Sequence, residues 1–239
     1  MGDKRTALIT GANRGIGRAV AEELHRRGLR VIVTARSARD AATAAREIVE
    51  VTGGGAGGGI GGEVVGEALD VTDAAGVRDA ARRIGAVDVL VSNAGVLLDA
   101  GTDPLTVPLD VVERTLAVNL LGAWRVAQAF VPGMVSRGWG RVVFVSSGIG
   151  TFSIGLAAGT PAYSVSKVAL NGLTTMLAAR TAAGGVLVNA VNPGQTRTRM
   201  MPTAPRTAAE AALDVAHAAT LPDDGPTGTL LRGTRPVPW

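Results

Sequence analysis

One tyrosine and one lysine stand out in this 239-residue chain because it contains almost no others. Tyr163 is the only tyrosine, and Lys167 is the only lysine besides Lys4. Their spacing places both side chains on one face of a helix that begins after Pro161. An ammonium group near a phenol is expected to lower the pKa of the phenol from about 10. Such a pair can pass a proton to or from the oxygen of a carbonyl or an alcohol.

Two adjacent serines end the apolar run at 141–146, which has the character of a buried strand. Ligands of open α/β sheets bind at the carboxyl ends of the strands, so these serines are expected beside the tyrosine and lysine. Ser147 is predicted to hydrogen-bond a substrate oxygen. Ser146 is the alternative for that role, and capping of the turn is the alternative function for both serines.

A glycine-rich turn, TGANRGIG at residues 10–17, follows the first apolar run and precedes an amphipathic stretch. In such a turn the free N–H groups and the positive end of the helix dipole face a pyrophosphate, and glycines let it approach the backbone. An ordinary tight turn is the alternative. The turn predicts a dinucleotide site that includes Gly11, Asn13, Arg14, Gly15, Ile16 and Gly17.

The second apolar run ends in Thr34-Ala35-Arg36, where a carboxylate would favour the 2′-hydroxyl of NAD(H) and a cation the 2′-phosphate of NADP(H). Arg36 stands at that place, and Arg14 projects toward it from the glycine turn. Two guanidinium groups suit a dianionic phosphate, whereas the alternative is that both are solvated surface arginines. The sequence therefore favours NADP(H), with NAD(H) second.

Short Val/Leu/Ile-rich runs alternate with helical patterns along the whole chain, as expected for βαβ units with a parallel sheet buried on both faces. No shift in composition marks a boundary, so residues 1–239 are predicted to form one α/β domain. The expected strands are 7–10, 30–34, 64–69, 87–92, 141–146, 186–191 and 227–231. The expected helices are 15–28, 37–51, 73–84, 108–136, 161–183 and 207–219.

Composition excludes several classes of protein. The chain is 46% hydrophobic and 18% charged, so it is not disordered, and without cysteine it has no disulfide or thiolate site. The net charge of +4 is spread over scattered arginines, which argues against nucleic-acid binding. No apolar stretch is long enough for a membrane span, so a soluble cytoplasmic protein is expected. His25 and His217 lack partners at ligand spacing, and no metal site is predicted.

A run of eight glycines in residues 53–62 interrupts the pattern before the third strand. It has no side chains to pack and lacks the Lys-Ser/Thr ending of a phosphate loop. We expect a flexible surface loop without a function.

In their order and spacing these motifs resemble the short-chain dehydrogenase/reductase family, single-domain type, over essentially the whole chain. The resemblance implies a Rossmann-type doubly wound parallel sheet of about seven strands with helices on both faces. The matching elements are the turn at 10–17, Asp70 and Val71, the Ser-Asn-Ala-Gly at 92–95, Asn119, Ser147 with Tyr163 and Lys167, and the segment after the sixth strand with Pro193, Gly194, Thr196 and Thr198.

The resemblance also implies a role for each residue. Tyr163 would donate a proton to the carbonyl oxygen as general acid. Lys167 would hold the nicotinamide ribose and lower the pKa of Tyr163, while Ser147 would orient the carbonyl. Asn119 would help to hold a water that links Lys167 to solvent. The implied cofactor contacts are the turn residues named above, Arg36, Asp70, Val71, Asn93, Ala94, Gly95, Tyr163, Lys167, Pro193, Gly194, Thr196 and Thr198.

The expected function is NADPH-dependent reduction of a ketone or aldehyde. Thr-Ala-Arg after the second strand and the tail at 220–228 and 235–239 are similar to NADP-dependent carbonyl reductases. The alternatives are alcohol oxidation, the reverse reaction, and a non-catalytic NADP-binding sensor. The long helices 108–136 and 161–183 are the expected surfaces of a homodimer or homotetramer.

Three loops, 96–106, 148–160 and 195–206, are predicted to border the substrate. Phe152, Met200 and Met201 suggest an apolar pocket there. Nothing in these loops identifies the substrate.

Overall fold

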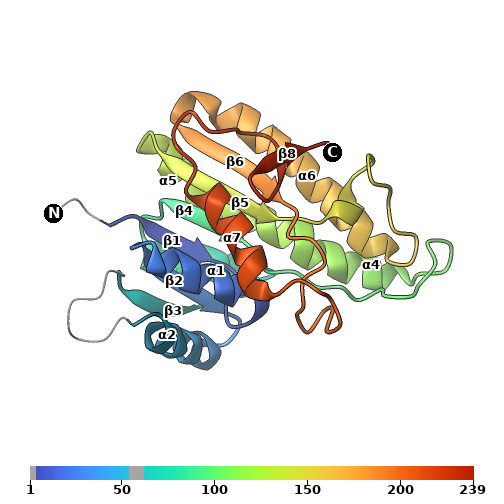
Figure 1. The fold of residues 1–239 in the computed structure, drawn as a ribbon, viewed down its shortest axis with the longest axis horizontal. Helices are drawn as coiled ribbons and strands as arrows, with labels where there is room; N and C mark the ends of the chain where they lie inside the picture. Colours follow the sequence, from blue (N-terminus) through green and yellow to red (C-terminus); the bar gives the residue numbers. More distant parts are fainter. Residues whose placement is uncertain (1–3, 54–61) are drawn as a thin grey trace.

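The computed structural model describes residues 4–53 and 62–239, so most of the glycine run lies outside the described residues. In these ranges eight strands form one sheet in the order β3-β2-β1-β4-β5-β6-β7-β8. Figure 1 shows the sheet crossing the molecule with helices packed against it. The strands are β1 (Thr6–Ile9), β2 (Arg30–Ala35), β3 (Val64–Ala68), β4 (Val89–Ser92), β5 (Gly140–Val145), β6 (Val186–Val191), β7 (Leu230–Arg232) and β8 (Arg235–Val237).

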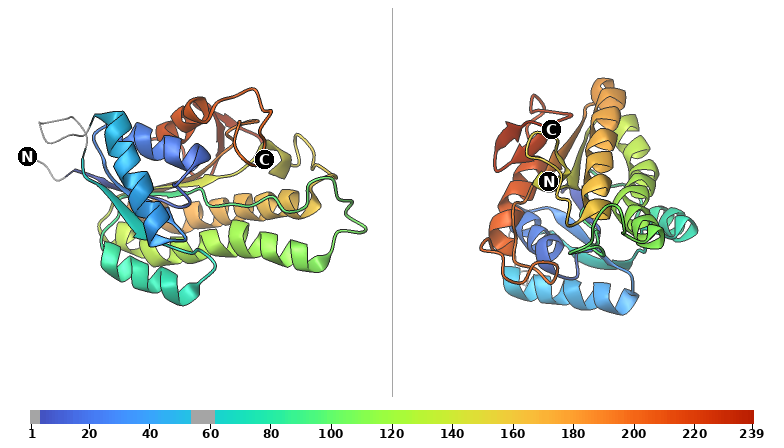
Figure 2. Two further views of the ribbon diagram at one scale, coloured as in Figure 1. Left: turned by 90° about the horizontal axis from the view of Figure 1, so that it is seen from below. Right: turned by 90° about the vertical axis from the view of Figure 1, so that its right-hand side faces the viewer.

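Helices cover both faces of the sheet (Figure 2). Buried residues of α1, α2 and α7 pack on one face, and those of α3, α5 and α6 pack on the other. The helices are α1 (Gly15–Arg26), α2 (Ala38–Thr52), α3 (Ala74–Ile84), α4 (Leu109–Leu116), α5 (Ala123–Ser136), α6 (Pro161–Thr181) and α7 (Ala208–Ala219). A π-helical turn, η1 (Ala117–Gly122), joins α4 to α5, and 3₁₀ turns η2 (Gly148–Gly150) and η3 (Ala182–Gly184) flank α6.

The continuous apolar runs become strands because both of their faces are buried. In β1, Ala7 and Ile9 belong to the apolar cluster beneath α1 and α7, whereas Leu8 belongs to the cluster beneath α3, α5 and α6. Val31 and Ile32 of β2 divide in the same way. Side chains alternate across a strand, so an all-apolar sequence supplies two cores at once.

The strand order reverses its direction between β1 and β4, which are neighbours in the sheet although two strands separate them in sequence. The connections that leave these two strands run to opposite faces of the sheet. This leaves a crevice between them at the carboxyl edge. Seven strands run parallel, so their carboxyl ends lie at that same edge.

The doubly wound parallel sheet predicted from the sequence is confirmed, and two details differ. The tail adds an eighth strand, β8, antiparallel to β7. Pro236 obscured this strand in the sequence, and an edge strand tolerates proline because it leaves N–H positions unpaired. The helix expected over 108–136 is divided into α4, η1 and α5. Within residues 4–53 and 62–239, no helix combines the length and apolarity needed to cross a bilayer.

Candidate active site

The carboxyl end of β5 and the first turns of α6 bring Ser147, Tyr163 and Lys167 together. The Lys167 side chain is 4% exposed, and its Nζ donates a hydrogen bond of 2.8 Å to the carbonyl oxygen of Val145. The same Nζ lies 5.4 Å from the centre of the Tyr163 ring. The side chain of Ser147 lies close enough to the phenol of Tyr163 to lower its pKa. A phenol, a hydroxyl and an ammonium group therefore share one site.

The two adjacent serines point in different directions. Ser146 is buried and donates a 2.6 Å hydrogen bond to Oδ1 of Asn171 on α6, which in turn donates to the carbonyl of Gly150. Ser147 instead contacts the Tyr163 hydroxyl. Successive residues of an extended backbone face opposite sides, so only one of the pair can face the tyrosine. The geometry favours Ser147 over the alternative.

Asn119 lies in the π-helical turn η1, an irregularity that often occurs at functional sites. Its Oδ1 accepts a 2.8 Å hydrogen bond from the N–H of Val96, and its Nδ2 donates to the carbonyl of Val96 and to Oγ of Ser166. Both amide hydrogens are thus used, and one oxygen lone pair is left for a water. Ser166 donates onward to the carbonyl of Tyr163 at 2.6 Å, so Asn119 is linked to the tyrosine backbone.

Burial dominates the electrostatics of the pair. Loss of hydration raises the pKa of Tyr163 to about 12, although the neighbouring Ser147 side chain acts in the opposite direction. Burial likewise lowers the pKa of Lys167 to about 8. The expected depression of the tyrosine pKa by the lysine is not seen: burial is the largest influence, and Ser147 is the group that lowers this pKa. The phenol is protonated at neutral pH.

The glycine turn and the end of β4 form one hydrogen-bonded unit. Oγ1 of Thr10 accepts from the backbone N–H groups of Asn93 and Ala94 at 2.9 and 3.0 Å. Nδ2 of Asn93 donates to the carbonyls of Thr10 and Gly11. A Cβ at Gly17 would lie 2.4 Å from that same Nδ2, so only glycine permits this approach. The predicted residues at 10–17 and 93–95 are thus brought together.

The amino end of α1 is suited to a pyrophosphate. Its N-cap, Arg14, makes no capping hydrogen bond and its first turn has no acidic residue, whereas Ser37, Asp73 and Thr207 cap α2, α3 and α7 with their side chains. The first N–H groups of α1 are therefore open to an anion. Gly15 has a φ of +57°, and a Cβ there would lie 3.5 Å from Thr198, which brings the segment after β6 beside the turn.

The residues expected around the adenosine lie after β1, β2 and β3. Arg14 and Arg36 are exposed, and the positive charge of Arg36 acts on Asp70. The hydroxyl and backbone N–H of Thr72 bond Asp70 and lower the pKa of its carboxyl, with Arg36 adding to the effect. Val71 is buried against Gly122 of η1.

An ion pair anchors the segment after β6. Arg206 donates to both carboxylate oxygens of Asp214 on α7 and to the carbonyl of Pro193 at 2.8 Å. Oγ1 of Thr196 also donates to that carbonyl. An open hollow of about 590 Å³ lies beside the segment and is lined by Gly194, Gln195, Pro205, Arg206, Asp214, Arg232 and Gly233.

The expected apolar pocket has a different character in the structure. Phe152, Met200 and Met201 are 74%, 42% and 41% exposed, so they lie on the surface of the loops at 148–160 and 195–206 rather than in a closed pocket. Ser153 in the first loop bonds the carbonyls of Trp239 and Pro238, which joins this loop to the tail after β8.

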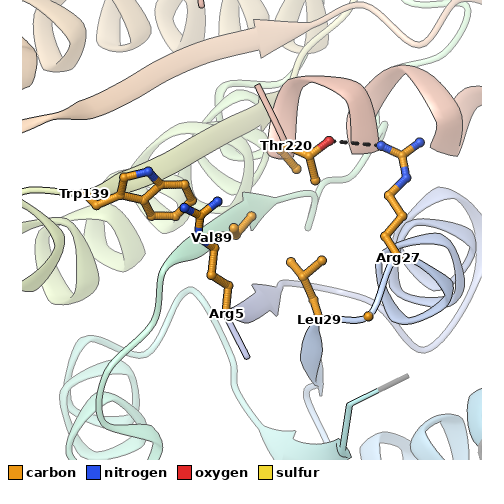
Figure 3. A pocket seen from close by; sticks show the side chains of 8 residues that line it. Arg5, Arg27, Leu29, Val89, Trp139 and Thr220 are labelled. Carbon is orange, nitrogen blue, oxygen red and sulfur yellow. Dashed lines mark hydrogen bonds between the residues drawn. The ribbon is translucent and has the colours of Figure 1, made fainter. Parts of the chain in front are cut away.

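A second cavity lies at the opposite, amino edge of the sheet, away from Tyr163. It measures about 200 Å³. Arg5 lies over the ring of Trp139 with its guanidinium carbon 3.5 Å from the ring centre, and Arg27 donates to Thr220 (Figure 3). Ligands of this sheet class bind at the carboxyl edge, so this cavity is not the candidate active site.

Sequence reasoning missed three polar residues that organise the site. Thr10 holds the glycine turn to β4, Arg206 anchors the segment after β6, and Asp99 bonds the first turn of α6. Thr10 and Asp99 act through contacts between segments far apart in the chain, whereas Arg206 bonds residues within the same stretch. Thr10 begins the glycine-turn motif and Asp99 follows shortly after a strand end, and these positions are the signals that the sequence offers.

Comparison with known proteins defines the class. The model of the short chain dehydrogenase family matches residues 5–209. The chain is 35% identical over 199 residues to the 3-oxoacyl-[acyl-carrier-protein] reductase FabG of Aquifex aeolicus, covering 82% of this chain and 75% of that protein. It is 35% identical over 203 residues to the oxidoreductase UcpA of Escherichia coli K12, covering 82% and 71%.

Solved structures agree with this result. A 3-oxoacyl-[acyl-carrier protein] reductase from Brucella melitensis superposes with a TM-score of 0.85 at 27% identity, covering 96% of this chain and 90% of that one. A Brucella melitensis reductase of the same description with bound NAD gives a TM-score of 0.83 at 27% identity, covering 97% and 90%. The chain belongs to the short-chain dehydrogenase family. It is an oxidoreductase of a family that uses a nicotinamide cofactor.

The buried ammonium of Lys167 predicts a pH-dependent stability. Its pKa is about 8 in the folded protein and about 10.5 ordinarily. Between these values the unfolded chain binds a proton that the folded chain does not, so the free energy of unfolding should rise with pH, by about 3 kcal/mol at most. Urea unfolding from pH 7 to 10 measures this. Lys167→Met should lack the rise and Lys4→Met should keep it. An identical pH dependence in all three proteins would contradict the burial of a cation.

Proposed function

We propose that the protein reduces a ketone or aldehyde to an alcohol with NADPH, using Tyr163 as the proton donor. The observation that carries the proposal is the grouping of Tyr163, Ser147 and the buried Lys167 at one site, with the Lys167 ammonium 5.4 Å from the centre of the Tyr163 ring. The names of relatives support it, since a 3-oxoacyl reductase acts on a ketone. The carbonyl reductase subtype rests on the residues of this chain.

The cofactor would lie across the carboxyl edge of the sheet. The open amino end of α1 would receive the pyrophosphate, and Asp70 with Val71 would contact the adenine. Arg14 and Arg36 would bind a 2′-phosphate. The nicotinamide would lie between residues 93–95 and the segment with Pro193, Gly194, Thr196 and Thr198. When bound, this group supplies the hydride that reduces the carbonyl carbon.

The residues of the chain would manage the proton. Ser147 would donate a hydrogen bond to the carbonyl oxygen and polarise it. Tyr163 would transfer its hydroxyl proton to that oxygen as charge develops there. Lys167 would hold the ribose hydroxyls and stabilise the tyrosinate that remains. Asn119 would keep one lone pair for a water that returns the proton from solvent.

The protonation state of Tyr163 supports its proposed role as a general acid. Burial keeps the phenol protonated, since its pKa is about 12. A protonated phenol is ready to act as an acid, whereas oxidation of an alcohol needs the phenolate as a base. A small carbonyl compound is therefore the proposed substrate. Assembly through α4, α5 and α6 stays a prediction.

Replacement of Tyr163 tests the proton donor. Tyr163→Phe keeps the ring and removes the proton, so kcat for NADPH-dependent carbonyl reduction should fall by about 10² to 10⁴. NADPH binding should change little. The measurement is NADPH oxidation over a panel of aldehydes, diketones, keto esters, quinones and cyclic ketones. Unchanged turnover in Tyr163→Phe would refute the assignment of the proton donor. If the wild-type protein reduces none of these compounds, the non-catalytic sensor becomes the better hypothesis.

The serine pair provides its own control. Ser147→Ala removes the group that contacts Tyr163 and should lower kcat by about 10² or more. Ser146→Ala removes a buried hydrogen bond to Asn171 and should lower stability by about 1 kcal/mol while kcat stays near wild type. Steady-state kinetics and urea unfolding separate the two effects. The reverse pattern, with kcat lost only in Ser146→Ala, would exchange the roles of the serines.

A charge reversal at Arg36 tests the cofactor preference. Arg36→Asp should weaken NADPH binding by about tenfold or more, because a charge-assisted bond to the 2′-phosphate becomes a repulsion. NADH binding should be little affected. Arg46→Asp, an exposed position on α2 that makes the same change in net charge, is the matched control. Dissociation constants come from cofactor fluorescence titration. A wild-type preference for NADH would defeat the proposal.

A further inference from the structure

The first turn of the catalytic helix α6 is not capped by its own neighbours. The N-cap residue, Thr160, makes no capping hydrogen bond with its side chain, and Pro161 has no N–H to donate. The next two N–H groups belong to Ala162 and Tyr163. Buried helix ends need partners for such groups, so another part of the chain has to supply them.

Asp99 supplies the acceptor from more than sixty residues away in sequence. Its Oδ2 accepts hydrogen bonds of 2.6 Å from the N–H of Ala162 and 3.2 Å from the N–H of Tyr163. The carboxylate is 0% exposed. A negative charge at a helix amino end is favoured by the helix dipole, and burial weakens competition from water.

The tyrosine is held on its other side as well. Its carbonyl accepts from Oγ of Ser166, which accepts from Nδ2 of Asn119. Asn119 is bonded to Val96, three residues before Asp99. Residues 93–99 thus run from the glycine turn to α6. Along this segment Asn93 bonds the turn, Val96 bonds Asn119, and Asp99 bonds the start of α6.

A further bond joins the two loops above the site. The N–H of Gly101 donates 2.8 Å to the carbonyl of Gly159, just before α6 begins. The N–H and hydroxyl of Thr102 both donate to the carbonyl of Asp99, which closes a turn around the carboxylate. The loop that carries Asp99 is therefore hydrogen-bonded to the end of the loop at 148–160.

One oxygen of this carboxylate has no role in the cap. Among the described residues nothing hydrogen-bonds Oδ1 of Asp99, although it is buried. A buried acceptor without a partner destabilises the fold. Oδ2 alone serves both N–H groups, so one carboxylate oxygen fixes the position of the helix start.

We propose that Asp99 is a positioning residue that clamps the first turn of α6 and thereby holds the Tyr163 hydroxyl against Ser147. The inference rests on the proposed function of Tyr163 as proton donor. It acts through the backbone of the tyrosine, because Asp99 bonds the N–H of the very residue whose side chain would react. A small displacement of a reacting group is enough to slow a reaction strongly.

The test compares three variants with wild type. Asp99→Ala removes the clamp, whereas Asp99→Asn keeps an oxygen that can accept the two N–H bonds. Thr181→Val is the matched control, since it removes buried hydrogen bonds to Leu177 and Val186 at the far end of the same helix. Circular dichroism and urea unfolding establish that each variant is folded.

Kinetics provide the first readout. Asp99→Ala should lower kcat for carbonyl reduction by about ten- to a hundredfold, with the KM for NADPH within about twofold of wild type. Asp99→Asn should retain kcat within about threefold of wild type, and Thr181→Val should retain it fully. Wild-type kcat in Asp99→Ala would overturn the proposal. An equal loss in Asp99→Asn or in Thr181→Val would also overturn it, because charge or general destabilisation would then be the cause.

The second readout does not depend on activity. Tyr163 is the only tyrosine, so the ultraviolet absorbance of phenolate during a pH titration reports its pKa alone. Asp99→Ala should move this pKa from about 12 toward 10, because the released turn exposes the phenol beside Lys167. Asp99→Asn and Thr181→Val should leave it in place. If Tyr163→Phe stays active, the proposed function fails, and the pKa of Tyr163 becomes the only test of the positioning role of Asp99. A lower pKa in Asp99→Ala than in wild type would then support that role, and an unchanged pKa would refute it.

Discussion

Parallel pairing of β1, β4, β5 and β6 places the carboxyl ends of four strands at one edge of the sheet, and the rest of the structure depends on this constraint. A helix must return the chain to the other edge after each strand, so every exit turn faces the same crevice. The glycine turn, Asn93, Ser147 and the Pro193 segment meet there although Thr10 and Pro193 lie at opposite ends of most of the chain. No single motif brings these segments together; the hydrogen-bonded pairing of the parallel strands does.

Burial sets the chemical character of the site. The same desolvation that raises the pKa of Tyr163 lowers the pKa of Lys167, so both side chains are driven toward their neutral forms. The bond from Lys167 to the Val145 carbonyl links the ammonium to the central strand and satisfies one of its donors. A protonated phenol is the starting state that the proposed reduction needs.

The loop after β4 connects this chemistry to the nucleotide side of the crevice. Asn93 bonds the glycine turn, Val96 bonds Asn119, and Asp99 bonds the first turn of α6. Because residues 93–99 are hydrogen-bonded at every third position, this segment fixes the glycine turn, η1 and the start of α6 relative to one another. The π-helical turn at Asn119 serves the same purpose, since it lies where α4 and α5 meet that loop.

Much of this protein was predictable from sequence because the signals are local. Continuous apolar runs identify strands buried on both faces, a glycine turn between a strand and a helix indicates a dinucleotide site, and a four-residue spacing places Tyr163 and Lys167 on one helical face. These patterns depend only on near neighbours in the chain. They identified the sheet and the residues that the proposed mechanism uses.

Other features depended on contacts that the sequence does not record. The separate directions of Ser146 and Ser147, the strand β8, the exposure of Phe152 and the balance of burial over charge at Tyr163 are all results of packing. Asp99 had no local pattern because its partners lie at the start of a distant helix. The sequence by itself determined the elements and the chemical groups. Only the tertiary structure decided their orientation, hydration and pairing, because these depend on residues that meet across the sheet.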